Sequence, residues 1–376
     1  MSEYYLAPNL AELKTADLNL QVYPFSLPMR VKFRGITVRN GVLITDGIAW
    51  VECSPFADYD VPFASRWLLG ALDELWAGRP EMVRSEVPIN ATIPAVPAVK
   101  AQEFAVQVPS GTAKVKVAEP GQNTTEDLAR LAAVREVLGA QGKIRIDVNG
   151  KWSLEEALEK LPKYNLAAGG LEYAEQPVLD TQDLAILRRK VSVPIAADES
   201  IRLAHNPFIV KTLAAADIAV IKNQPIGGIR AGLSLAAELE LPVVASSALE
   251  SSIGLSSGVA MAAAFPELNY ACGLGTATMF FHDVVSRPLQ ANNGVLVPKT
   301  MMPDFSRRGD IDADTGALVG MVAANDDVDA AKLSNNAGSS SEIRKIMQRF
   351  SDLWDYLQSR QLISSAAKYS WGGKLG

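Results

Sequence analysis

The chain has 376 residues, 48% of them hydrophobic, and a formal net charge of −6. This length is enough for a large core and two domains, while the acidic balance and the absence of basic runs exclude an evident nucleic-acid partner. The longest apolar run, residues 253–265, contains serines and glycines and is too short to span a bilayer, so no membrane insertion is expected. Cys53 and Cys272 make no disulfide framework and the N-terminus lacks a secretion signal, so we expect a cytoplasmic protein.

Residues 1–89 predict an α+β module. Residues 18–51 alternate apolar and polar positions, with Gly35 and the Asn40-Gly41 pair as turn signals. We expect an antiparallel meander with strands at residues 20–25, 29–33 and 42–51. Residues 58–78 then change to a helical period, with Trp67 and Leu68 on the apolar stripe.

Residues 90–290 predict a parallel (β/α) barrel, because strand and helix patterns alternate about eight times at spacings of about 25 residues. Thr124 and Ser153 are the expected N-caps of two of the helices. A doubly wound open sheet is the alternative, but no glycine-rich dinucleotide loop follows the first strand. The candidate strands begin at Asn90, Thr112, Lys143, Gly170, Pro194, Ile218, Pro242 and Asn269. The candidate helices are residues 125–140, 154–161, 181–191, 207–216, 228–239 and 251–265.

Residues 291–376 fall outside this repeat. Residues 310–341 are rich in Asp, Asn, Ala, Ser and Gly, which is typical of a loop or a partly disordered linker. Residues 343–362 then resume a helical stripe, which we expect to pack back on the folded body. A partner-binding helix is the alternative.

Polar side chains at the C-terminal ends of consecutive candidate strands indicate an active site. In residues 143–150, the period of two places Ile144, Ile146 and Val148 on one face and Arg145, Asp147 and Asn149 on the other. Parallel strands are normally buried on both faces. A strand with one polar face is therefore explained if that face lines the solvent-filled end of a barrel, where active sites are built. The strand ends supply, in order, Lys114 and Lys116, Asp147 and Asn149, Glu175, Asp198 and Lys222.

Three converging carboxylates repel one another unless a cation lies among them. The chain has two histidines, so oxygen ligands are expected, and these suit Mg²⁺. Lysines near such an ion should have a depressed pKa, so that one acts as a base on the α-proton of a carboxylate substrate and the other stabilises the intermediate. Each residue alone has a structural alternative as an edge, turn or cap residue, but together they are hard to explain in that way.

These motifs resemble the enolase superfamily, in its muconate-lactonising-enzyme-like branch. Within that branch the chain looks most like the o-succinylbenzoate synthase family of the actinobacterial type, through residues 54–59, 88–94 and 271–275. The superfamily motifs are Lys114-Val115-Lys116, Asp147-Val148-Asn149, Ala174-Glu175-Gln176-Pro177, Ala197-Asp198-Glu199-Ser200 and Ile221-Lys222-Asn223.

The resemblance implies a capping domain over a modified TIM barrel, and Mg²⁺ held by Asp147, Glu175 and Asp198. It implies that Lys116 takes the α-proton of 2-succinyl-6-hydroxy-2,4-cyclohexadiene-1-carboxylate. Lys222 would face Lys116 and stabilise the enediolate by its charge and by cation–π contact with the ring. Lys114 would tune Lys116. Syn loss of water would then give the aromatic product, a step of menaquinone synthesis.

Contacts to the substrate are less clearly marked. Arg145 can pair with a substrate carboxylate or form a structural ion pair, and Asn149 shares its strand face. Ser246, Ser247 and the turn from Gly273 to Gly275 can hold the succinyl group through backbone amides, or they can only relieve crowding. A capping segment around residues 23–34 is expected to close over the site.

Two alternatives stay open. Relatives with the same lysine pair racemise N-acylamino acids, so an N-acylamino acid racemase or a dipeptide epimerase is the second hypothesis. A non-catalytic barrel that acts as a metal-dependent binding protein is the third. The polar segment after residue 300 and the helix that follows it extend past the usual family core.

Overall fold

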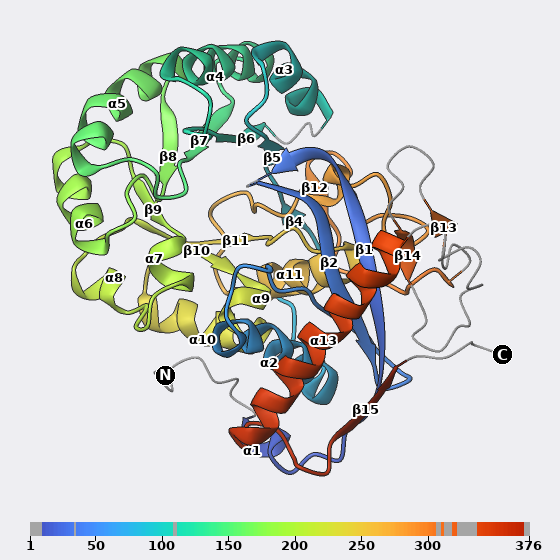
Figure 1. Cartoon of the computed structure of the whole chain (residues 1–376). Helices are drawn as coiled ribbons and strands as arrows, with labels where there is room; N and C mark the ends of the chain where they lie inside the picture. Colours follow the sequence, from blue (N-terminus) through green and yellow to red (C-terminus); the bar gives the residue numbers. More distant parts are fainter. Residues whose placement is uncertain are drawn as a thin grey trace.

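The computed structural model describes residues 10–33, 35–107, 111–305, 310–311, 318–321 and 337–371. The chain forms a capping part, built on a mainly antiparallel sheet, and a larger part in which a curled parallel sheet carries helices on its outside (Figure 1). The parallel (β/α) barrel with an N-terminal α+β cap, predicted from the sequence, is confirmed.

The capping sheet starts with β1 (Asn19–Phe33), β2 (Ile36–Thr45) and β3 (Trp50–Cys53). The predicted strands at 20–25 and 29–33 are one continuous strand, because the ladder between β1 and β2 persists through Pro28 and is only irregular between Pro28 and Phe33. The predicted strand at 42–51 is divided between β2 and β3. A turn separates them, in which Asp46 Oδ1 accepts the N–H groups of Ile48 and Ala49 at 2.9 Å.

Helix α2 (Val61–Ala77) covers the capping sheet on the side of the barrel, where it packs against the short helix α9 (Asn223–Ile226). Its N-cap is Asp60, whose carboxylate accepts the N–H of Phe63 at 2.8 Å. Trp67, Leu68 and Leu72 on one face of the helix are fully buried, as the helical stripe predicts.

The C-terminal segment returns to the cap. Helix α13 (Ala337–Ser359) lies against α2 and the capping sheet and buries Phe350 and Leu357 (Figure 1). Strand β14 (Leu318–Met321) pairs antiparallel with β1, and β15 (Lys368–Trp371) pairs parallel with it. The short β13 (Asp310–Ile311) pairs with β14, and most of the predicted polar linker lies outside the described residues. The tail therefore contributes strands to the capping sheet, which the sequence did not predict.

The barrel sheet contains seven parallel strands among the described residues, in the order in which they occur along the chain. The eighth predicted strand, starting at Asn269, is reduced to bridges from residues 272–273. Cys272 bridges Ile89 and Gly273 bridges Ser246, so this short segment joins the two edges of the sheet. The strands are β5 (Ala91–Ile93), β6 (Thr112–Lys116), β7 (Lys143–Asp147), β8 (Leu171–Glu175), β9 (Ile195–Ala197), β10 (Ile218–Lys222) and β11 (Val243–Ser246).

Helices cover the outside of this sheet (Figure 1). The predicted N-cap Ser153 is confirmed, with a capping box to Glu156. The cap of α4 is Asn123 and not Thr124, because Asn123 and Glu126 exchange the two capping hydrogen bonds. In the described part of the chain, the helices lack the combination of length and apolar character needed to cross a membrane. The helices are α3 (Ala98–Gln107), α4 (Thr124–Leu138), α5 (Leu154–Ala167), α6 (Thr181–Lys190), α7 (Glu199–Arg202), α8 (Ile209–Thr212), α10 (Ile229–Leu239) and α11 (Ser252–Ala264).

Candidate active site

The register of the parallel strands gathers the predicted site residues at one end of the barrel. Lys116 is paired with Asp147 across β6 and β7, and Asp147 with Glu175 across β7 and β8. Asp198 directly follows β9, and Lys222 is the last residue of β10. All five side chains are buried. Strand polarity explains this convergence, since the carboxyl ends of parallel strands share one edge.

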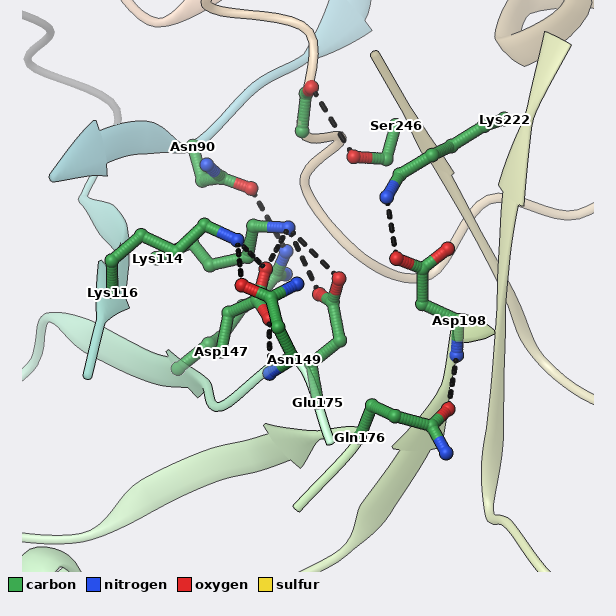
Figure 2. Close-up of polar contacts among 12 residues, drawn as sticks. Asn90, Lys114, Lys116, Asp147, Asn149, Glu175, Gln176, Asp198, Lys222 and Ser246 are labelled. Carbon is green, nitrogen blue, oxygen red and sulfur yellow. Dashed lines mark hydrogen bonds and ion pairs between the residues drawn. The ribbon is translucent and has the colours of Figure 1, made fainter. Parts of the chain in front are cut away.

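Each lysine is paired with a carboxylate (Figure 2). Lys114 Nζ lies 3.0 Å from both carboxylate oxygens of Glu175 and 3.2 Å from Asp147 Oδ2. Lys116 Nζ donates to Asp147 Oδ2 at 2.6 Å, and Lys222 Nζ donates to Asp198 Oδ2 at 2.5 Å. The lysines therefore flank the acids from two sides, Lys114 and Lys116 on one and Lys222 on the other.

Burial and mutual repulsion set the ionisation of these groups. Burial, followed by the charge of Asp147, raises the pKa of Glu175 to about 7. Burial also opposes ionisation of Asp147, but the charges of Lys116 and Lys114 outweigh it and hold the pKa of that carboxyl well below its usual range. Burial lowers the pKa of Lys114, but the charges of Glu175 and Asp147 outweigh it and leave this pKa above its ordinary value. The depressed pKa expected for a lysine beside a bound metal ion stays a prediction.

Neighbouring polar groups hold the acids in place. Gln176 Oε1 accepts the N–H groups of Asp198 at 3.0 Å and Ser200 at 3.1 Å, which ties the end of β8 to the end of β9. Arg202 Nε donates to Asp198 Oδ1 at 3.1 Å. Asp198 is therefore fixed through both its backbone and its side chain.

The donor set fits a divalent cation, although in the described residues no three acidic, histidine or cysteine side chains lie close enough together to form a metal site as they stand. Asp147, Glu175 and Asp198 are fully buried, and the charges of Asp147 and Asp198 both raise the pKa of Glu175. A cation among them would relieve that repulsion. Carboxylate oxygens are the ligands that hard divalent ions prefer.

The three lysines and Asp147 line a cavity of about 20 Å³ under the cap. Phe33 and Phe56 of the cap and Leu249 of the barrel form part of its wall. Phe33 lies in the segment, residues 23–34, that was expected to close over the site. Phe56 and Leu249 were not predicted as wall residues, because an aromatic or leucine side chain in a cavity wall has the same local pattern as one in the core. A larger groove of about 560 Å³ between β2 and α13 contains none of the lysines or acids described above.

Four predicted substrate contacts stand as follows. Ser247 and Gly273 line the cavity. The amide N–H of Ser247 is bonded to Gly273 O, and that of Gly273 to Ala245 O, so both are used in the sheet. Asn149 Oδ1 accepts from Lys116 Nζ at 2.6 Å, which makes it a partner of the lysine. In the described chain, Gly275 is not part of the cavity wall and packs against residues 89–90.

Arg145 takes the structural alternative. Its Nε donates to Glu172 Oε2 at 2.5 Å and its NH1 donates to Ala271 O at 2.6 Å. The guanidinium also lies 4.7 Å from the ring centre of Tyr173. Arg145 is fully buried in these contacts, below the cavity that Lys116 lines.

Comparisons with known proteins agree with this geometry. Residues 98–302 match the family model described as enolase C-terminal domain-like, and residues 24–74 match the one described as enolase N-terminal domain-like. The o-succinylbenzoate synthase of Thermobifida fusca is 47% identical over 80% of this chain and 94% of its own length. That of Mycolicibacterium smegmatis is 46% identical over 77% of this chain and 89% of its own length.

The chain belongs to the o-succinylbenzoate synthase family of the enolase superfamily. The superfamily predicted from the lysine and carboxylate motifs is thereby confirmed. The fold of the enolase superfamily also appears in the muconate lactonizing enzyme of Pseudomonas fluorescens. That structure superposes with a TM-score of 0.63 at 20% identity, over 76% of this chain and 96% of the other. Enzymes of the superfamily generally use a divalent metal ion.

Proposed function

We propose that the chain is an o-succinylbenzoate synthase, a lyase that dehydrates 2-succinyl-6-hydroxy-2,4-cyclohexadiene-1-carboxylate to an aromatic product in menaquinone synthesis. Its curated relatives carry this activity in their names and are 44–47% identical over most of this chain. The single observation that carries the proposal is that Lys116 and Lys222 line one cavity and lie on two sides of the buried acids (Figure 2).

Lys116 is the base of the proposed reaction. It removes the proton from the ring carbon that bears the carboxylate, which leaves an enediolate on the substrate. The protonated Lys116 then gives this proton to the hydroxyl group, and the bond from the ring to that group breaks, so that water leaves on the same face and the ring becomes aromatic. Lys222, across the cavity, places its positive charge against the enediolate. Lys114 is fixed between Glu175 and Asp147, from where it acts on Lys116 by its charge.

Mg²⁺ is the cofactor that we propose for Asp147, Glu175 and Asp198. It would supply positive charge beside the substrate carboxylate and so acidify the neighbouring C–H bond. We also propose a cytoplasmic location, which the free, buried thiols of Cys53 and Cys272 support. The proposed partner is a small carboxylate substrate.

The test is direct. Purified protein is incubated with the cyclohexadiene carboxylate and Mg²⁺, and formation of the aromatic ring is followed by ultraviolet absorbance. Aromatic product is expected, and its loss on chelation of the metal would agree with the cofactor. No product under saturating substrate and Mg²⁺ would end the proposal.

A racemase or epimerase is the second candidate, because Lys116 and Lys222 both line the cavity and lie on two sides of the acids (Figure 2). Two such bases can remove and return an α-proton on either side of an N-acylamino acid or a dipeptide. This activity predicts that deuterium from solvent enters both enantiomers of the substrate. Failure of deuterium to enter either one would remove this candidate.

A further inference from the structure

Arg39, on β2 of the cap, is a buried cation that joins two loops from different parts of the molecule. Its Nε donates to the carbonyl oxygen of Leu249 at 3.0 Å, in the barrel loop after β11. Its NH2 group donates to the carbonyl oxygen of Ser54 and, at 3.0 Å, to Ser54 Oγ, at the end of β3. One guanidinium therefore holds a cap loop and a barrel loop at the same time.

Both of these loops form walls of the active-site cavity. Phe56, two residues after Ser54, and Leu249 both line this cavity. The guanidinium of Arg39 also lies 4.4 Å from the ring centre of Phe56, which fixes the ring by a cation–π contact. Arg39 itself does not line the cavity in the described chain, so its effect on the site passes through these two side chains.

The backbone conformation of Leu249 shows why the hydrogen bond from Arg39 is needed. Leu249 has a φ of +63°, a left-handed conformation that costs a non-glycine residue about 1–2 kcal/mol. Hydrogen bonds on both sides of the residue maintain it: the N–H of Leu249 donates to Ser247 Oγ at 3.1 Å, and its carbonyl accepts from Arg39. Without the second bond, the loop loses one of the two constraints that keep the leucine in this conformation.

The charge of Arg39 is balanced by acids around it. Glu52 reaches it through Ser54, whose Oγ donates to Glu52 Oε1 at 2.5 Å, and Glu250 also acts on it by its charge. A lysine at position 39 would keep this charge. It would not keep the planar fork that bonds two carbonyl oxygens and stacks on a ring.

We infer that, if the proposed function holds, Arg39 is a positioning residue that fixes the apolar wall of the substrate cavity by holding Phe56 and Leu249 in place. Wall contacts of this kind are made equally in the bound substrate and in the transition state. Their loss raises KM and leaves kcat nearly unchanged. Arg39 makes none of the described hydrogen bonds to the lysines and acids of the site, so the proton transfer itself is unaffected.

The experiment compares Arg39→Lys with Arg84→Lys. Arg84 also donates to carbonyl oxygens, those of Ala262 and Phe265 at 2.7 Å and of Pro266 at 3.3 Å, but at the opposite end of α11 from the site. We expect Arg39→Lys to raise KM at least about tenfold and to lower kcat less than about threefold. Arg84→Lys should leave both constants within about twofold of the wild type. A KM within twofold of the wild type in Arg39→Lys, or an equal rise in Arg84→Lys, would overturn the inference.

Two further measurements keep the inference testable. Hydrogen exchange followed by mass spectrometry should show faster exchange at residues 54–57 and 247–250 in Arg39→Lys and not in Arg84→Lys. This readout needs no turnover, so it decides the positioning role even if the wild type makes no aromatic product and the proposed function fails. If Arg39→Lys does not fold, Leu249→Gly removes the wall side chain at a φ that glycine adopts freely. An unchanged KM in that variant would overturn the inference.

Discussion

The side-chain oxygen of Gln176 accepts the backbone N–H of Asp198 at 3.0 Å (Figure 2). Gln176 directly follows Glu175, the last residue of β8, so the residue after one proposed metal ligand positions the next one, Asp198, which directly follows β9. Its amide nitrogen is also fully used, donating to Ser200 Oγ at 2.7 Å and Val178 O at 2.8 Å. The two strands are therefore locked together at the point where their carboxylates leave the sheet.

We predict that Gln176→Leu weakens Mg²⁺ binding about 10- to 100-fold, since outer partners that orient metal ligands have effects of this size. The leucine leaves the N–H of Asp198 without its acceptor and frees the turn at residues 198–200. Calorimetric titration of the protein with Mg²⁺ alone measures the effect. An unchanged metal affinity in a folded variant would show that the turn holds Asp198 without Gln176.

Lys116→Ala should lower kcat by about 10³-fold or more, because loss of a positioned base removes a contribution of this order from the transition state. The fold should be preserved, since Lys116 is the last residue of β6 and its hydrogen bonds to Asp147 and Asn149 lie at the end of the barrel sheet. Turnover of the cyclohexadiene carboxylate and circular dichroism measure the two effects. Lys163→Ala, at an exposed lysine paired with Glu159, is the control. Near-native rates in Lys116→Ala would show that another group is the base.

Asp198→Asn should weaken Mg²⁺ binding first and turnover as a consequence. The substitution removes a negative charge that now faces Lys222 and Arg202. We expect the Mg²⁺ concentration for half-maximal activity to rise at least about tenfold, with part of the activity restored at high Mg²⁺. Asp217→Asn, at a carboxylate that pairs with Arg188 before β10, is the control and should leave the Mg²⁺ requirement unchanged. Loss of activity that no Mg²⁺ concentration restores, with unchanged metal affinity, would contradict this order of effects.

The strand pattern was sufficient to predict which residues share the site. Lys116, Asp147, Glu175 and Lys222 each end a strand, and the strand period of two fixes the face on which a side chain lies. It does not fix depth in the barrel. Arg145 shares the face of Asp147 but lies two residues earlier on β7, about 7 Å nearer the barrel floor. At that depth it meets Glu172 and Tyr173 and does not line the cavity.

The contacts between distant segments could not be predicted in the same way. β15 pairs with β1 across almost the whole chain, and Leu20 is paired there with Tyr369. A strand's local pattern shows that it is a strand but not which partner it has. For the same reason the local sequence around Arg39 indicates only a polar position in a strand. It does not reveal the contact with Leu249, which lies 210 residues away.

Glu52 gives a prediction about stability and pH. Burial, which outweighs the hydrogen bonds from Ser251 and Ser54, raises the pKa of Glu52 from 4.5 to about 7. Between these two pH values the folded chain binds more protons at this site than the unfolded chain. The contribution of Glu52 to the free energy of unfolding is therefore complete below pH 4.5, and it is lost as the pH rises to about 7.

Glu52→Gln removes this titration while keeping the size of the side chain. The free energy of unfolding of the variant minus that of the wild type should therefore rise by about 2 to 3 kcal/mol from pH 5 to pH 8, because only the wild type loses stability over this range. Urea denaturation of both proteins at these two pH values measures the change. Glu52 also accepts the N–H groups of Ser251 and Gly254, so the variant is expected to be less stable than the wild type at both pH values. The prediction is therefore tested by how the stability difference between the two proteins changes with pH. A difference between the two proteins that is the same at pH 5 and pH 8 would show that Glu52 keeps one protonation state across this range.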